Sequence, residues 1–196
     1  MKHQSTVFKY LTPEIISSLN QDLFNNKNNP LWGNHVAEKT LMYKEYSING
    51  PLRHGKTIWL EHVWHARTSL AWIFGDIKNF PETEKIIREL AGICDYGRCY
   101  WHTLPPGAEI DKHQDTADIP SYFDFVKTRY QIYLDIPEEA IIIIDDKIWD
   151  LKTLKNCILD FNMTLPHYYK NNSNRDFTFA VIDILNPDCK VINRPN

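Results

Sequence analysis

Apolar residues recur at helical spacing in two stretches of the chain. The first follows Thr12, which suits a helix N-cap, and Pro13, which suits the first helical position, and it ends in the Asn-rich loop 25–29. The second begins at Pro81 and ends at Gly92. The residues on the buried faces are Ile15, Ile16, Leu19 and Leu23 in the first stretch and Ile86, Ile87 and Leu90 in the second. The pattern therefore predicts two amphipathic helices.

From about Tyr100 the pattern changes, because the apolar segments become short and rich in β-branched and aromatic residues. Pro, Gly and Asp separate them, and Asp145 to Lys147 is typical of a turn. The predicted strands are Arg129–Ile136, Ala140–Ile144, Asn156–Phe161 and Phe177–Leu185. Earlier in the chain we expect a strand at Lys56–Leu60 and a helix at Ala66–Phe74.

Short strands preceded by helices predict a mainly β fold with flanking helices, a jelly-roll or cupin-like barrel also called a double-stranded β-helix. The 196 residues, 43% of them hydrophobic, suit a single domain. Within it we expect a helical N-terminal support with some strands at 1–98, the jelly-roll core at 99–186 and a tail at 187–196.

Composition and charge argue against several classes of function. The formal net charge of −3 gives no basic field, so a nucleic-acid partner is unlikely. The start of the chain has no apolar signal segment, and the longest aliphatic run, Ala140–Ile144, is far shorter than the ~20 residues of a membrane span. The four cysteines are scattered without CxxC spacing, which favours reduced thiols. We therefore expect a soluble cytoplasmic protein without a membrane partner.

Three residues form a candidate metal site. His113 and Asp115 are two positions apart, so in an extended segment both side chains project from the same face. His167 follows a predicted strand far downstream and could complete the set from a neighbouring strand. Two histidines and one carboxylate, with one face of the metal open, are the ligands of non-haem iron oxygenases. The H-x-D spacing alone is weak evidence, and an exposed loop histidine is the alternative for His113.

Arg175 lies eight residues after His167, at the start of the apolar strand Phe177–Leu185. An arginine that points into a barrel is costly unless an anion meets it. A dicarboxylic co-substrate would supply that charge, with the guanidinium paired to its distal carboxylate. A surface charge in the Asn-rich turn is the alternative for Arg175.

These segments together resemble the aspartyl/asparaginyl β-hydroxylase family of 2-oxoglutarate oxygenases. The resemblance lies in blocks that occur in family order: Leu104–Gly107 with His113-Gln114-Asp115, Arg129–Pro137, Leu165-Pro166-His167, and Asn172, Arg175 and Val181–Asp183. It covers roughly residues 100–185. The resemblance implies Fe(II), 2-oxoglutarate and O2 as cofactor and co-substrates.

The resemblance also implies roles for single residues. His113, Asp115 and His167 would hold iron and carry the catalysis, Arg175 would bind the distal carboxylate of 2-oxoglutarate, and Arg129 would contact co-substrate or substrate. Gln131 stands where animal members carry a histidine that contacts 2-oxoglutarate, so this co-substrate contact is altered or lost here. Animal members lack the ligand carboxylate, whereas this chain keeps Asp115.

The implied reaction is hydroxylation of an aliphatic C–H position, with 2-oxoglutarate converted to succinate and carbon dioxide. We expect an Asp or Asn side chain in a peptide or protein as substrate, with a free amino acid or a lipid acyl chain as alternatives. Trp101 or His102 could line the substrate pocket, because their strand leads into the metal segment. Oligomeric state and the oxidised bond are not readable from the sequence.

Three other interpretations remain open. A non-catalytic cupin-like module could keep the barrel with zinc or without metal, although it would have no reason to retain the ligand set and Arg175 together. A nucleic-acid oxygenase would need a basic groove. His62 and His65, three apart, would share a face and could bind a second metal if they lay on a helix, but a packed or substrate-facing pair is the simpler interpretation.

Overall fold

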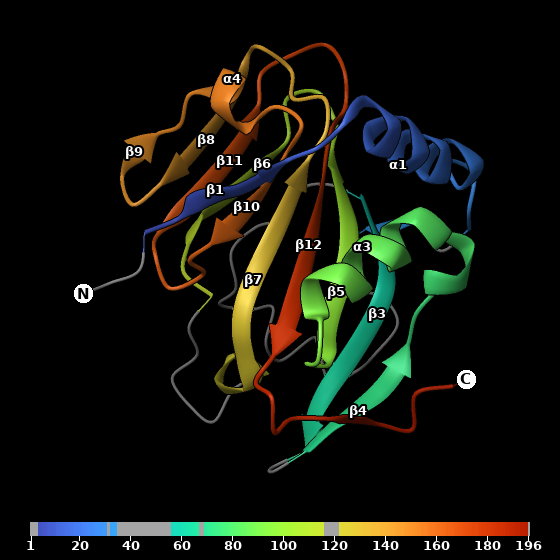
Figure 1. Cartoon of the computed structure of the whole chain (residues 1–196). Coiled ribbons are helices and arrows are strands. Elements are labelled where there is room, and N and C mark those ends of the chain that lie inside the picture. Colours follow the sequence, from blue (N-terminus) through green and yellow to red (C-terminus); the bar gives the residue numbers. More distant parts are fainter. Residues whose placement is uncertain (1–3, 31, 35–55, 67–68, 116–121, 196) are drawn as a thin grey trace.

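The computed structural model describes residues 4–30, 32–34, 56–66, 69–115 and 122–195. It consists of three layers, in which helices cover one face of a large β-sheet and a smaller sheet covers the other (Figure 1). Hydrophobic residues fill both interfaces. The layered arrangement is that of a jelly roll supported by helices on one side.

The large sheet has nine strands, in the order β1-β10-β7-β12-β5-β3-β4-β13, with β2 paired to β3. Their bounds are β1 Thr6–Tyr10, β2 Gly33–Asn34, β3 Lys56–Ala66, β4 Ser69–Phe74, β5 Tyr96–Leu104, β7 Val126–Tyr133, β10 Cys157–Phe161, β12 Phe177–Leu185 and β13 Val191–Ile192. The small sheet has the order β6-β11-β8-β9, with bounds β6 Glu109–His113, β11 His167–Asn171, β8 Ala140–Ile144 and β9 Lys147–Ile148. The helices are α1 Pro13–Asn25, α3 Pro81–Ala91 and α4 Leu151–Leu154, with 3₁₀ turns η1 Ile77–Asn79 and η2 Tyr122–Phe125.

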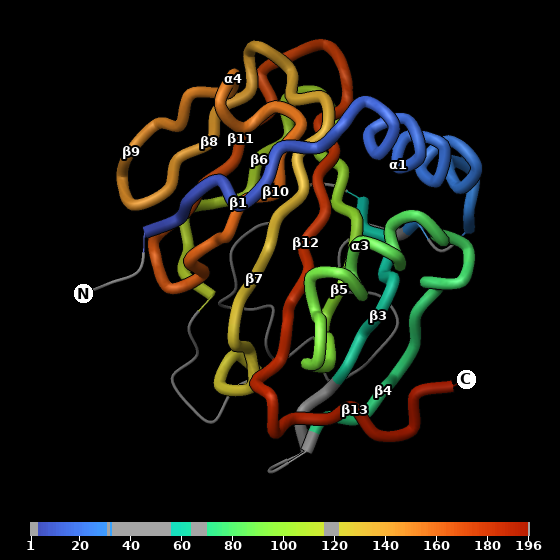
Figure 2. Tube along the Cα trace, in the orientation of Figure 1, coloured from blue at the N-terminus to red at the C-terminus, as the bar shows by residue number. Residues whose placement is uncertain are grey.

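Four neighbouring strands of the large sheet, β5, β12, β7 and β10, face the four strands of the small sheet (Figure 2). The side chains between them include Tyr133, Ile142 and Leu159. On the opposite face of the large sheet, Trp101 packs with Leu19 of α1 and Ile87 of α3. The prediction of a mainly β jelly roll with flanking helices is confirmed.

Local signals place most elements correctly. The Thr12 hydroxyl accepts a hydrogen bond from the Ile15 backbone N–H at 3.4 Å, and α3 ends at Gly92, whose φ of 58° is the left-handed conformation that glycine adopts easily. Asp145 and Asp146, with φ of 55° and 59°, form the turn between β8 and β9. Two positive φ values in a two-residue turn match the twist of a hairpin. The two helices, this turn and the late strands agree with the sequence patterns.

The predicted helix at Ala66–Phe74 is wrong. Ala66 ends β3, and Ser69–Phe74 form strand β4, which is antiparallel to β3. Helix propensity is a weak preference that tertiary pairing overrides. Here the long strand β3 pairs with β4 along the length of β4, apart from one register shift between His62 and Val63, and the aromatic and β-branched residues of 72–74 suit a sheet.

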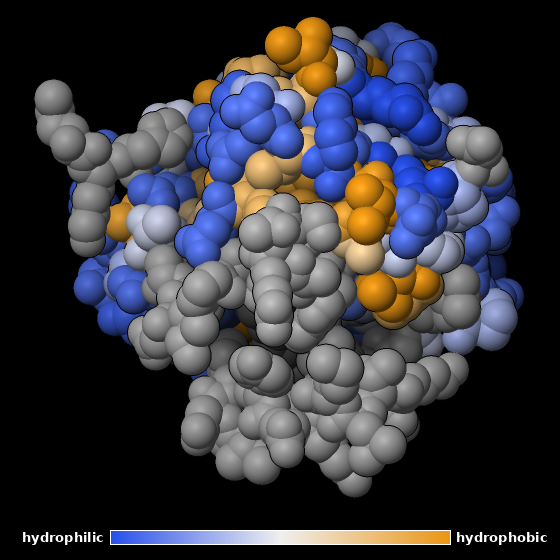
Figure 3. Space-filling model, turned by 90° about the horizontal axis from the view of Figure 1, so that it is seen from below, coloured by the Kyte–Doolittle hydropathy of each residue, from blue (hydrophilic) through white to orange (hydrophobic). Residues whose placement is uncertain are grey.

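In the part of the chain that the structure describes, we find no helix long and apolar enough to cross a membrane. On the face shown in Figure 3, hydrophobic side chains lie next to hydrophilic ones. The large apolar residues exposed on the molecule include Phe8, Phe24 and Ile148, from three different elements. Single exposed apolar side chains of this kind are ordinary on folded proteins.

Candidate active site

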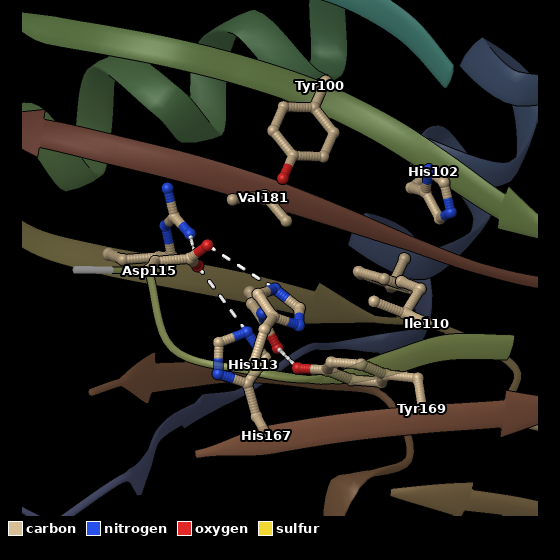
Figure 4. A pocket seen from close by; sticks show the side chains of 11 residues that line it. Tyr100, His102, Ile110, His113, Asp115, His167, Tyr169 and Val181 are labelled. Carbon is tan, nitrogen blue, oxygen red and sulfur yellow. Dashed lines mark hydrogen bonds and ion pairs between the residues drawn. The ribbon is translucent and has the colours of Figure 1, made fainter. Parts of the chain in front are cut away.

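The register of the small sheet brings the three predicted metal ligands together. His113, the last residue of β6, pairs directly with His167, the first residue of β11. Asp115 follows two residues after His113, and its carboxylate oxygens lie 3.5 Å from His113 Nε2 and 3.6 Å from His167 Nε2. One ligand atom from each residue lies within 4.8 Å of the others, and all three side chains converge in Figure 4.

Both imidazoles are oriented by their own chain. His113 Nδ1 donates to the carbonyl oxygen of Asp111 at 2.7 Å, and His167 Nδ1 donates to that of Leu165 at 2.9 Å. A carbonyl only accepts, so Nδ1 carries a proton in both rings and Nε2 is the nitrogen that faces Asp115. Burial lowers the pKa of His167 to about 4, the largest effect, and Asp115 opposes it. His167 is therefore neutral at pH 7, as metal ligation requires.

Arg129 joins the carboxylate of Asp115 to a second buried carboxylate. Its Nε and Nη2 donate to the two oxygens of Asp183 at 2.6 and 2.9 Å, and its Nη1 donates to Asp115. Burial alone would lower the pKa of Arg129, but Asp183 and Asp115 outweigh it and hold the pKa well above its ordinary value. Three of the five N–H groups of the guanidinium therefore donate to these two acids.

The Asp183 carboxylate is also held from the opposite side. Tyr122 donates its hydroxyl to Asp183 at 2.9 Å and accepts from the Arg98 backbone N–H at 2.6 Å. Gly97 makes room for this hydroxyl, because a Cβ there would lie 2.3 Å from it. Hydrogen bonds thus connect Tyr122, Asp183, Arg129 and Asp115 in that order. Through them, residues of the large sheet hold the carboxylate of Asp115, the third candidate metal ligand, in place.

A pocket extends from the three ligands between the two sheets. On the large sheet, Arg129 and Gln131 of β7 and Val181 and Phe179 of β12 line the pocket at successive positions along the strands. The lining also includes Tyr100, His102, Ile110 and Tyr169. Tyr100 and Tyr169 approach the pocket from opposite sheets (Figure 4).

Uncharged groups form the end of the pocket away from Arg129. The Oε1 atom of Gln131 accepts hydrogen bonds from Tyr169 Oη at 2.8 Å and from Tyr133 Oη. Burial is the largest effect that raises the pKa of both tyrosines, so both hydroxyls stay protonated donors at neutral pH. Gln131 is therefore held in a single orientation.

The structure does not bring Arg175 together with the other predicted site residues. Its guanidinium donates to the Asp135 carboxylate and, at 3.3 Å, to the Ile136 carbonyl. Its side chain is 46% exposed, and it does not line the pocket. Arg129 and Gln131 do line the pocket, with the metal ligands.

The two candidate substrate residues, Trp101 and His102, lie on opposite faces of the sheet, because neighbouring residues on a strand face opposite sides. His102 lines the pocket, where its Nδ1 lies 2.7 Å from Thr57 Oγ1. Trp101 is fully buried on the helix side and donates to Thr83. Tyr100, Tyr169 and Asp183 were not singled out as site residues from the sequence; Tyr100 and Tyr169 share strand faces with His102 and His167. Asp183 was visible as a lone charge in an apolar strand.

The possible second metal site at His62 and His65 required both residues to lie on one face of a helix. Both lie on strand β3 instead, so this argument for a second site does not hold. The His62 ring is buried and stacks on Phe74, with centroids 4.8 Å apart. Burial, the largest effect, lowers its pKa to about 3. The side chain of His65 lies outside the described residues.

The donor set at the pocket fits iron(II). Two Nε2 atoms in the correct tautomer and one carboxylate, with both histidines oriented through Nδ1, are the ligands and outer contacts of a two-histidine, one-carboxylate centre. No second group of three potential ligands is found among the described residues. The pocket is lined by these ligands and lies on the side where a co-substrate would have to bind.

A sequence model described as aspartyl/asparaginyl beta-hydroxylase matches residues 43–187. No curated protein matches the chain. Among solved structures, a prolyl-4-hydroxylase from Pseudomonas putida is similar, with a TM-score of 0.57 at 13% identity over 93% of this chain and 91% of that one. A prolyl hydroxylase from Trichoplax adhaerens, solved with a hypoxia-inducible-factor peptide, has a TM-score of 0.60 at 12% identity over 92% and 83%. At such low identity the two structures support the fold alone.

Proposed function

The chain belongs to the aspartyl/asparaginyl β-hydroxylase family, and from this premise we propose that it hydroxylates an Asp or Asn side chain in a peptide or protein. The enzyme class itself follows from the family: the protein is a 2-oxoglutarate-dependent oxygenase of the hydroxylase type.

The observation that carries the proposal is the convergence of His113, Asp115 and His167 beside the pocket. We assign these three side chains as the iron ligands. Iron(II) bound there would supply the redox chemistry that couples O2 and 2-oxoglutarate to C–H hydroxylation, with succinate and carbon dioxide as the other products. The carboxylate of Asp115 supports this assignment, because it gives the open, three-ligand set that oxygenases of this type use.

The protein's own residues position and shield the reactants. Arg129 restrains Asp115 and balances its charge together with that of Asp183. Tyr100, Ile110 and Val181 give the pocket apolar walls, which keep water away from the reacting C–H bond. The open coordination face and these walls together provide what a hydroxylase needs: one site for the co-substrate and one for a C–H bond.

A peptide or protein substrate is favoured over the alternatives. The family is named for Asp and Asn residues, and the Trichoplax adhaerens enzyme of the same fold was solved with a peptide. A free amino acid, a lipid acyl chain, and a non-catalytic metal-binding role remain as outcomes of the test. Four free cysteines support a reducing compartment, so we propose the cytoplasm as the location.

The test is a coupled assay with purified protein, Fe(II), 2-oxoglutarate and O2. Asp- and Asn-containing peptides, free Asp and Asn, and an acyl chain are compared as substrates, with succinate and oxygen incorporation measured by mass spectrometry. We expect peptide-dependent succinate and one added oxygen atom per succinate. The control is His113→Ala, which should form no product. Turnover with free amino acids alone would redirect the substrate assignment, and equal succinate from wild type and His113→Ala would reject the iron site.

A further inference from the structure

Arg98 differs from the other described arginines because no carboxylate of the described residues pairs with it. The other four each form an ion pair with an Asp or Glu side chain: Arg88, Arg129, Arg175 and Arg194. The Arg98 guanidinium instead lies over the Tyr122 ring, 3.9 Å from its centroid, and its Nε makes one long contact of 3.5 Å with the Val63 carbonyl oxygen. Arg98 is only partly buried. Its charge is therefore available to an anionic group of a ligand.

Two ionisable side chains near Arg98 do not pair with it. His62 is neutral at pH 7, because burial and, to a smaller extent, the charge of Arg98 lower its pKa to about 3. Asp183 is linked to the Arg98 backbone N–H through the Tyr122 hydroxyl. Its two oxygens, however, accept hydrogen bonds from the Arg129 guanidinium. Neither His62 nor Asp183 therefore forms an ion pair with Arg98.

Arg98 lies beside the pocket, at the start of an aromatic surface made of Tyr100, Trp59, His62 and Phe74. Arg98 is two residues from Tyr100 on β5, so both side chains are on the face of the sheet that lines the pocket (Figure 4). The Trp59 ring centroid lies 4.7 Å from that of Tyr100 and 4.5 Å from that of His62. Phe74 stacks on His62 with centroids 4.8 Å apart and is 45% exposed. The aromatic surface therefore leads from the pocket outward over β3 and β4, beyond the strands that the small sheet faces (Figure 1).

The spacing suits a peptide that lies across this surface. Two residues along a strand span about 7 Å, which is the step from Tyr100 at the pocket to Arg98. An extended peptide covers the same distance in two residues, so a side chain within two positions of the reacting one can reach the guanidinium. Aromatic rings provide contact area for the apolar part of such a peptide, and a guanidinium binds a carboxylate through two parallel N–H groups. The ligand that fits both features is a peptide with an acidic residue near its reacting residue.

We propose that Arg98 binds the carboxylate of an acidic residue within two positions of the hydroxylated residue, while the peptide lies on the aromatic surface. This inference rests on the proposed function, and it names the sequence feature by which that site selects its peptide. The other role open to Arg98 is purely structural, because its stacking supports the Tyr122 ring, whose hydroxyl donates to Asp183. The two roles predict different results, because a structural role does not discriminate between peptides.

The test measures which peptides the enzyme hydroxylates. Wild type and variants are given Fe(II), 2-oxoglutarate, O2 and a mixture of short peptides, each with one central Asn or Asp. The flanking positions carry Ala, Glu, Gln, Lys or Phe in equal amounts. Tandem mass spectrometry then identifies the peptides that gain oxygen.

The variants separate the charge of Arg98 from its contact with Tyr122. Arg98→Met removes the charge and keeps a side chain that can cover the ring, and Arg98→Glu reverses the charge. Arg98→Gln is a second neutral variant if Arg98→Met does not fold. Arg88→Met is the matched control, since Arg88 is paired with Glu84 on α3 at the other face of the large sheet.

Wild type should favour Glu over Gln at one flanking position by about 10-fold, the lower end of the range for a hydrogen bond to a charged group. Arg98→Met should lose this preference, and Arg98→Glu should favour Lys over Glu at the same position. Arg88→Met should keep the wild-type preference. Anaerobic Fe(II) titration and thermal unfolding of each variant measure the structural role separately.

Two results would overturn the inference and leave the proposed function standing. Wild type could hydroxylate peptides without any preference for acidic flanks, or Arg98→Met could keep the preference and lose only stability or Fe(II) affinity. Either result would restrict Arg98 to the support of Tyr122. If wild type hydroxylated no peptide in the mixture, the proposed peptide substrate would fail, and this inference with it.

Discussion

The two ends of the pocket are built from opposite chemistry. At the metal end, two acids, one arginine and His167 are buried and His113 is partly buried, and ion pairs and hydrogen bonds connect them. One two-residue step away, Gln131, Tyr133 and Tyr169 are equally buried but uncharged. The charged end needs each partner to remain charge-balanced, whereas the neutral end only needs its hydrogen bonds.

This contrast shows that buried charged residues and buried neutral residues need different partners. A divalent metal is the cation that the acidic end of the pocket lacks, since Asp115 and Asp183 together outnumber Arg129. An unpaired charge buried this deeply costs much free energy, whereas a buried amide that lacks one hydrogen bond costs less. Substitutions at the two ends should therefore differ in their cost to stability and in their effect on metal binding.

The largest effect is expected at the metal ligands. His113→Ala or Asp115→Ala should abolish activity and weaken Fe(II) binding by more than 100-fold, because loss of an outer partner alone costs about 10- to 100-fold. The fold should persist, since His113 is a strand end and Asp115 follows it. Anaerobic Fe(II) titration with circular dichroism checks both points. An unfolded His113→Ala protein would mean that His113 is structural.

The next largest effect is a difference between the two ends in how much a substitution lowers the free energy of unfolding. Arg129→Leu leaves Asp183 and Asp115 without their counter-charge and should lower the free energy of unfolding by about 3–5 kcal/mol. Gln131→Leu, the matched change at the neutral end, should cost about 1 kcal/mol. Urea denaturation of the metal-free proteins measures both. Equal losses would show that the two ends do not differ as described.

Of the two ends of the pocket, acid should act on the metal end. The pKa of His167 is about 4 in the folded protein and 6.5 in the unfolded chain, so below pH 6.5 the unfolded state binds the extra proton. Stability from this residue is therefore complete above pH 6.5 and falls as the pH drops toward 4, by about 2 kcal/mol between pH 6.5 and 5.

Urea denaturation of the metal-free protein at pH 7 and pH 5 checks this prediction. His167→Leu should flatten the difference by about that amount, while Tyr169→Phe at the neutral end should keep the wild-type difference. An unchanged difference in His167→Leu would place the acid sensitivity elsewhere.

The smallest effect is expected outside the pocket. Arg175→Leu removes an exposed pair with Asp135, and exposed pairs contribute about 0–1 kcal/mol. The loss in unfolding free energy should stay below about 1 kcal/mol, and steady-state kinetics should show an unchanged Michaelis constant for 2-oxoglutarate. If that constant instead rose by about 10-fold or more, Arg175 would return to the co-substrate site.

Elements with strong local signals were predictable from the sequence. The cap at Thr12, the turn at Asp145 and Asp146, and the apolar run Phe177–Leu185 each depend on neighbouring residues. The strand Ser69–Phe74 was mistaken for a helix because its partner, β3, lies in a different segment whose pairing the local pattern does not show.

The candidate site was predictable only in part, for the same reason. His113, Asp115 and His167 could be selected by residue type and spacing, and strand pairing brings them together. The sequence could not show which arginine is buried, because that depends on register. Pairing of β7 with β12 places Arg129 against Asp183, whereas Arg175 lies before β12 begins.

The most direct measurement is an anaerobic titration of the purified protein with Fe(II) and then 2-oxoglutarate, followed by visible absorption. The account predicts one Fe(II) per chain and a weak charge-transfer band that appears only when 2-oxoglutarate is added, with neither in His113→Ala. Fe(II) binding to wild type no better than to His113→Ala, and no band, would contradict the metal centre on which the proposed function depends.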